Sequence, residues 1–276
     1  MLIGAHESIA GGPSKAFARA VEHGARSLQI FTRSARGWSS PPLTDEECVA
    51  FRAEAKRTGL PVIAHGSYLA NLGTDDPALR VKSIDCVQDE LTRCERLGVP
   101  YLVIHPGSHP DEARGIAQIA SALDQVHAQT PKFRAKVCLE VTAGQGSAIG
   151  WRFEHLAAIL SAVRHEARLG CCLDTCHLYA AGHDFVGRGG YEKVLAALDH
   201  AVGLSRVKCF HLNDCKKPLG CRVDRHEEIG KGTIGRSGFR ALVNDERFAQ
   251  TVAVLETPSP EHYGQSIRLL ESLVRA

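Results

Sequence analysis

The chain has 276 residues, of which 44% are hydrophobic and ten are cysteines; the formal net charge of +2 does not by itself indicate a nucleic-acid partner. No apolar run approaches the roughly 18 residues of a membrane span, and the N-terminus lacks the basic and apolar regions of a signal peptide, so we do not expect a membrane-bound or secreted protein. We expect a soluble cytoplasmic protein with reduced cysteines, because a domain of this size needs no disulfides.

Eight short apolar runs recur along the chain and are predicted to be β-strands. They cover residues 2–6, 27–32, 61–65, 101–105, 136–140, 169–174, 206–211 and 252–256. The runs are apolar throughout rather than alternating, which is typical of parallel strands that are covered on both faces.

Helical signatures occupy the segments between these runs. Residues 13–24 have proline at the start and glycine at the end, Thr44 and Glu47 form a capping box, and residues 77–98 are long, periodic and glycine-terminated. Further helices are expected to begin near Asp111, Trp151, Gly190, Ser237 and Pro260. Strand followed by helix, repeated eight times, predicts an α/β protein with a (β/α)8 TIM barrel, as a single domain over residues 1–276.

Six successive strands are predicted to end in a residue that can bind a metal ion. In chain order these residues are His65, His105, Glu140, Asp174, His211 and Glu256. The carboxyl ends of the strands converge at one mouth of a barrel, where barrel enzymes have their active sites. One such residue is often only a polar group where the chain leaves the core, but six in succession are poorly explained by chance. Crowded carboxylates would raise one another's pKa, and a cation between them removes that cost.

Three further candidates follow strand ends. His177 lies three residues after Asp174, and Asp224 and His226 lie two apart in the long loop after the seventh strand. Residues two apart in an extended segment face the same way, so Asp224 and His226 could hold one ion together. Nine ligands exceed the four or five that zinc takes. Two or three ions are therefore expected, with zinc favoured and manganese or iron possible, in a site that suits hydrolysis at phosphorus.

Other residues near the predicted mouth have less specific interpretations. Cys176 competes as a metal ligand, although a structural thiol is the preferred interpretation. His6 and His109 are expected to contact the ligands or the substrate. The segment "GKGTIG" at 230–235 matches G-x-G-x-x-G but does not directly follow a strand, so it is weak evidence for a nucleotide site. Its backbone N–H groups could still approach a phosphate.

Ten blocks of sequence resemble, in order, endonuclease IV, the zinc-dependent apurinic/apyrimidinic endonuclease family. They include "HGSYLANLG", "LDTCH", "HLNDCK" and "RVDRHEEIGKGTIG", and the likeness runs from about residue 2 to 260. The resemblance implies three zinc ions, held respectively by His65, His105 and Glu140, by Asp174, His211 and Glu256 with Glu140 bridging, and by His177, Asp224 and His226. It implies cleavage of duplex DNA 5′ to an abasic site, leaving a 3′-hydroxyl, with Glu140 orienting or deprotonating the nucleophile. Trimming of blocked 3′ ends is also implied.

The resemblance further implies that Arg36, Tyr68 and Leu69 bind DNA by insertion. Inserted side chains unstack a base step, and flipping a nucleotide out costs least where the base is missing. Without the resemblance, loop packing would be the preferred interpretation of Tyr68 and Leu69. A basic rim is expected to contact phosphates and consists of Arg33, Arg36, Lys216, Lys217, Arg222, Arg225 and Lys231. The resemblance suggests a monomer.

Two positions depart from the family's pattern, and two other functions stay open. Val141 follows Glu140 where asparagine is common, and Cys215 stands where serine is usual, which puts the rate and the metal preference in question. A xylose-isomerase-like sugar isomerase or epimerase would need only one or two ions and would leave Asp224 and His226 unexplained. A non-catalytic binder of abasic DNA is disfavoured by the complete ligand set.

Overall fold

Eight parallel strands close into a barrel in the computed structural model, which describes residues 1–274. The strands pair in the order β1-β12-β9-β8-β6-β4-β3-β2, and β1 pairs with β2 to complete the ring. Their bounds are Leu2–His6 (β1), Leu28–Phe31 (β2), Val62–His65 (β3), Tyr101–Ile104 (β4), Lys136–Glu140 (β6), Leu169–Asp174 (β8), Val207–His211 (β9) and Val252–Leu255 (β12). The predicted TIM barrel is confirmed, and every strand lies within one residue of its predicted bounds. The predicted domain includes residues 275 and 276, which lie outside the described residues.

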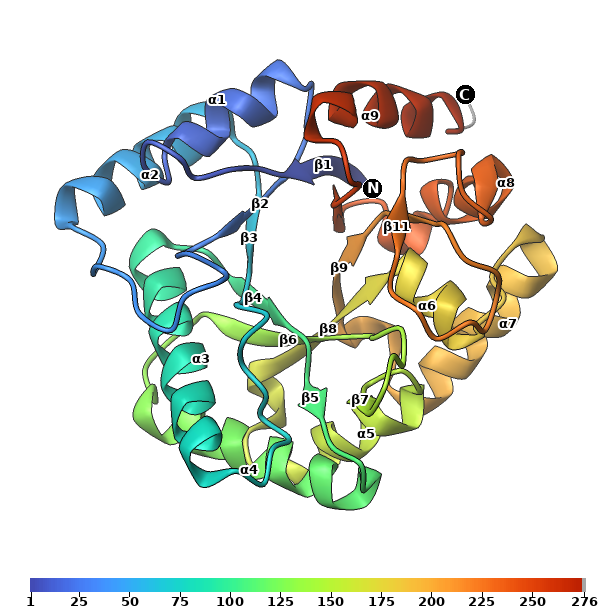
Figure 1. The fold of residues 1–276 in the computed structure, drawn as a ribbon. Helices are drawn as coiled ribbons and strands as arrows, with labels where there is room; N and C mark the ends of the chain where they lie inside the picture. The colour runs from blue at the N-terminus through green and yellow to red at the C-terminus, as the bar shows by residue number, and fades with distance from the viewer. Residues whose placement is uncertain (275–276) are drawn as a thin grey trace.

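Helices surround the barrel on its outer side (Figure 1). The longer ones are Lys15–Glu22 (α1), Asp45–Thr58 (α2), Pro77–Leu97 (α3), Glu112–Gln129 (α4), Phe153–Ala162 (α5), Gly187–Ala201 (α7), Gly235–Val243 (α8) and Tyr263–Ser272 (α9). The capping box predicted for α2 is present, because Thr44 and Glu47 each accept the other's backbone N–H with a side-chain oxygen. In the described part of the chain no helix has the length and apolar character needed to cross a membrane.

Short elements at the mouth of the barrel were not predicted from the sequence. Helix α6, Thr175–Ala181, follows β8 directly and carries His177. Two antiparallel ribbons also form, one from β5 (Gly107–Ser108) and β7 (Ala148–Ile149), the other from β10 (Asp214–Cys215) and β11 (His226–Glu227). Single 3-10 turns cover Glu166–Arg168 (η1), Leu204–Arg206 (η2), Glu246–Phe248 (η3) and Pro260–His262 (η4).

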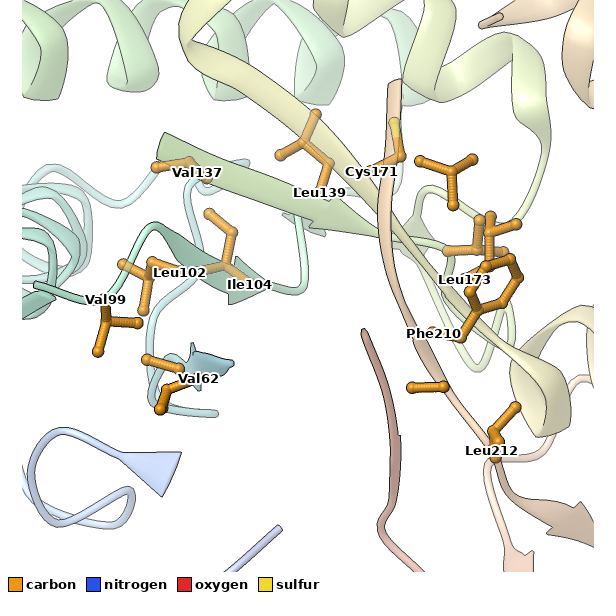
Figure 2. Close-up of a cluster of buried hydrophobic side chains, with 14 of the residues drawn as sticks. Val62, Val99, Leu102, Ile104, Val137, Leu139, Cys171, Leu173, Phe210 and Leu212 are labelled. Carbon is orange, nitrogen blue, oxygen red and sulfur yellow. The ribbon is translucent and has the colours of Figure 1, made fainter. Parts of the chain in front are cut away.

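Alternate residues of the strands build two separate cores. Figure 2 shows part of the outer core, where side chains such as Leu102, Leu139 and Phe210 lie between the strands and the helices. The inner core fills the barrel and consists of Ile63, Val103, Cys138, Cys172, Cys209 and Val254, all with no exposed surface. Because both faces of each strand are buried, the strands are apolar throughout, as the sequence pattern indicated.

Candidate metal centre

The six predicted strand-end ligands form the next layer above the inner core. Each stands two residues after a member of that core, in the pairs Ile63 and His65, Val103 and His105, Cys138 and Glu140, Cys172 and Asp174, Cys209 and His211, and Val254 and Glu256. Residues two apart in a strand face the same side, so all six side chains point into the barrel at its C-terminal mouth. The convergence predicted from the sequence is present.

Glu140 lies at the centre of this layer and is fully buried. Its Oε2 is 3.2 Å from Nε2 of His65 and 3.3 Å from Nε2 of His105. Its Oε1 is 3.0 Å from Nδ1 of His211 and 3.1 Å from Nδ1 of His177. Burial opposes its charge, but the neighbouring His211 and His105 hold the pKa of Glu140 well below its usual range. A carboxylate between two pairs of imidazoles is suited to bridge two cations.

Two clusters of ligand atoms share Glu140. His65, His105 and Glu140 form the first group, whose ligand atoms all lie within 4.8 Å of one another, and Glu140, Asp174, His211 and Glu256 form the second group at the same spacing. In the second group, Nδ1 of His211 is 3.2 Å from Oε2 of Glu256. Burial disfavours the charged imidazole, yet Glu256 and Glu140 raise the pKa of His211 well above its usual value. Divalent cations would balance the negative charge of these carboxylates.

The third group, as expected from the sequence, is His177, Asp224 and His226, from α6 and the loop after β9. The ligand atoms of His177 and His226 also lie within 4.8 Å of one another and of Asp174. Oδ2 of Asp224 is 3.1 Å from Nε2 of His177, and Oδ1 is 3.3 Å from Nε2 of His226. Both ring nitrogens are buried and lie near these oxygens without a well-aligned hydrogen bond, as expected of atoms that bind a cation together with Asp224. Burial disfavours the charge of Asp224, but His177 lowers its pKa to about 2. The residues therefore fit a metal ion. Cys176 also lies within 4.8 Å of Asp224 and His226.

Outer contacts orient the ligands, and two of the residues involved were missed from the sequence. Gln29 donates to Glu256 at 2.6 Å, and its oxygen is 2.9 Å from Nε2 of His211. Asn213 donates to Oδ2 of Asp174 at 2.6 Å and accepts the N–H of Glu256. Such contacts fix the direction in which a ligand points. A signal for Gln29 was available, because it is the one amide within an apolar run at 27–32.

Comparison with known proteins identifies the family. The model of the family described as xylose isomerase-like TIM barrel matches residues 17–273. The chain is 49% identical over 278 residues to the probable endonuclease 4 of Chloroflexus aurantiacus, covering 99% of this chain and 98% of that protein. The structure of endonuclease IV from Thermus thermophilus matches it with a TM-score of 0.88 and 39% identity over 99% of this chain and 98% of that one.

The chain belongs to the endonuclease IV family. It is therefore an enzyme of the nuclease class. D-psicose 3-epimerase from Clostridium cellulolyticum also matches, with a TM-score of 0.72, but at 14% identity, over 100% of both chains. That likeness shows a shared fold only.

The two departures from the endonuclease IV pattern lie beside the ligands. The backbone carbonyl of Val141 accepts a hydrogen bond from Nδ1 of His177 at 3.0 Å. Every residue type has this carbonyl, so the absence of a polar side chain at Val141 leaves that contact intact. Cys215 is fully buried, and its thiol contacts that of Cys176.

Residues expected to contact DNA in an endonuclease IV lie around the mouth. Arg36 is exposed, Leu69 is half-buried and the side chain of Tyr68 is 59% exposed. The ring of Tyr68 is 5.2 Å from that of His65 and 6.0 Å from that of His105, between ring centroids. A cavity of about 400 Å³ opens beside these rings and is also lined by His177 and Asp224. Tyr68 and Leu69 therefore border the candidate metal centre.

One expectation for the basic rim was wrong. Arg33 is buried, and its guanidinium donates to Asp89 at 3.0 Å and to the carbonyl of Gly37 at 2.6 Å. It supports the segment that carries Arg36 and does not belong to the exposed rim. Nε2 of His109 is 2.8 Å from Oδ2 of Asp75, whereas His6 lies 3.4 Å from Glu256, as expected.

The glycine-rich segment 230–235 does not offer its N–H groups to a phosphate. The carboxylate of Asp214, on β10, accepts the N–H groups of Gly230, Gly232, Ile234 and Gly235 at 2.9 to 3.3 Å. An ideal Cβ on Gly232 would lie 2.4 Å from the carbonyl oxygen of Cys215. Close backbone approach accounts for Gly232, and positive φ values of 79° and 64° account for Gly230 and Gly235. The suggested phosphate role was wrong.

Proposed function

We propose that this nuclease cleaves duplex DNA at the phosphodiester bond 5′ to an abasic site, leaving a 3′-hydroxyl, with three zinc ions. The observation that carries the proposal is the convergence of eight imidazole and carboxylate side chains around Glu140 at the mouth of the barrel. Relatives at 49% and 41% identity are named probable endonuclease 4. The mixture of imidazole and carboxylate ligands supports zinc, with manganese or iron as substitutes.

The first, second and third groups would each hold one ion. Divalent ions, when bound, would lower the pKa of the attacking water and neutralise charge on the attacking and leaving oxygens. Glu140, between the first and second groups, orients the attacking water and accepts its proton. His177 and Asp224 of the third group line the 400 Å³ cavity, and an ion held there would contact the phosphate on the leaving side.

DNA binding is assigned to the exposed residues at the mouth. Arg36, Tyr68 and Leu69 enter the duplex at the abasic site, because unstacking there costs least. The exposed members of the basic rim, such as Lys216, Lys217 and Arg225, contact phosphates. The same centre would trim blocked 3′ ends, since these are also phosphate esters. We further propose that the protein acts as a monomer in the cytoplasm.

Incision of a defined duplex tests the proposal. The substrate carries one tetrahydrofuran abasic analogue, and the undamaged duplex serves as the control. We expect a single cut 5′ to the analogue, none in the control, loss of the cut after chelation and recovery with zinc. An intact damaged strand, together with epimerisation of a free ketose by the same preparation, would favour the epimerase alternative.

A further inference from the structure

We propose that a stack between Arg222 and Trp151 positions the loop that presents Asp224 and His226 to the third ion. The inference rests on the proposed function, which assigns an ion to the third group. Ligands on strand ends are held by the barrel, but Asp224 belongs to the irregular part of the loop between β10 and β11. Its direction must therefore come from contacts made by the loop.

Arg222 has an unusual backbone conformation two residues before Asp224. Its φ of 53° is the sole positive value of a non-glycine residue in the described chain, 1–274. The left-handed region is unfavourable for side chains other than glycine, so surrounding contacts must maintain it. The guanidinium carbon of Arg222 lies 3.7 Å from the centroid of the Trp151 ring, within cation–π distance.

Trp151 is a fixed platform for this contact. Its carbonyl accepts a hydrogen bond from Nε2 of His183 at 3.0 Å. An ideal Cβ on Gly144 would lie 2.9 Å from Cγ of Trp151, so glycine there allows the backbone to pack against the ring. The guanidinium of Arg152 lies 5.0 Å from the same ring centroid. Because Trp151 precedes α5, the stack ties the loop after β9 to a different part of the barrel.

Few other bonds hold the loop just before Asp224. The N–H of Arg222 donates to the carbonyl of Ala180 at 2.9 Å, and that of Gly220 donates to Tyr179 at 3.1 Å. The N–H of Asp224 donates to Oε1 of Gln145 at 3.1 Å. The Cys221 thiol also donates within the turn, to the carbonyl of Val223 at 3.7 Å. What ties the side chain of Arg222 to the start of α5 is the stack on Trp151. Its loss should weaken the third group and spare the first two.

Zinc affinity, measured without DNA, tests the inference. Competition with a chelating chromophore gives the number of ions and the dissociation constant of the weakest one. We expect three ions in the native protein and, in Arg222→Ala and in Trp151→Leu, a weakest ion bound about fivefold less tightly, the effect expected of one cation–π contact. Hydrogen exchange of amides 220–226 should quicken in both variants. Trp151→Phe, which retains an aromatic face, should recover most of the affinity.

Controls separate the stack from charge and backbone effects. Lys217→Ala removes an exposed positive charge from the same loop and should leave all three affinities unchanged. Arg222→Gly relieves the backbone conformation, and native affinity in this variant would overturn the inference. The double variant Arg222→Ala, Trp151→Leu should lose no more zinc affinity than either single variant, because both substitutions remove the same contact. A loss equal to the sum of the two single losses would also overturn the inference. Two ions in the native protein would refute the third-ion assignment itself, before any variant is compared.

Discussion

Replacement of Asp214 by asparagine tests the structural role of the glycine-rich segment. The buried Oδ1 accepts the N–H groups of Cys215 and Ile234 at 2.8 and 3.0 Å, and Oδ2 accepts those of Gly230 and Gly232 at 2.9 and 3.1 Å. An asparagine retains one oxygen and turns an NH2 group toward the other pair of donors. Whichever way the amide turns, two N–H groups lose their acceptor.

The expected loss follows from these two bonds. A hydrogen bond to a charged group contributes about 1.5–3 kcal/mol, so two such bonds give about 3–6 kcal/mol. That is a large part of the roughly 5–15 kcal/mol by which a domain is stable. Because Asp214 pairs with Glu227 in the β10–β11 ribbon, the variant should also loosen the segment that carries His226.

Urea unfolding of the metal-free protein measures this free energy without a contribution from bound ions. Asp45→Asn is the matched control, because Asp45 is 92% exposed in its ion pair with Arg96 and should change stability by less than about 1 kcal/mol. If Asp214→Asn destabilised the protein no more than this control, the buried carboxylate would not be the anchor inferred for the segment.

Three further changes have defined outcomes. Glu140→Gln should preserve binding to abasic duplex in a gel-shift assay and lower kcat at least about a hundredfold, because it removes the proposed base; unchanged kcat would contradict that role. Arg36→Ala should weaken binding of abasic duplex while zinc content stays at the native value, and lost zinc would point to misfolding instead. Burial raises the pKa of Glu90 to about 7. The contribution of Glu90 to stability is thus present below its unfolded pKa of about 4.5 and is lost as pH rises through about 7. Glu90→Gln should therefore raise the free energy of unfolding by about 1–3 kcal/mol more at pH 8 than at pH 5, with a correspondingly larger rise in Tm. Equal shifts at the two pH values would contradict the raised pKa.

The sequence by itself determined the barrel and the ring of candidate ligands at its mouth. Apolar runs are local signals, and they predicted the strands to within one residue. Terminal glycines and the Thr44–Glu47 capping box are local signals too, and they predicted helices. Strand geometry also predicted the site, because a side chain two positions after Cys138 or Cys209 faces the barrel interior as those cysteines do. Glu140 and His211 could therefore be brought together from residues far apart in the chain.

Only the tertiary structure decided what the polar groups outside that ring contact. Arg33 and Arg36 are three positions apart in the same segment. Arg33 is nevertheless buried and bonded to Asp89 on α3, whereas Arg36 is exposed. Asp214 accepts the N–H groups that the sequence left available to a phosphate. The physical reason is that a strand fixes its own side-chain directions, whereas a loop takes its direction from whichever element the closed barrel brings against it.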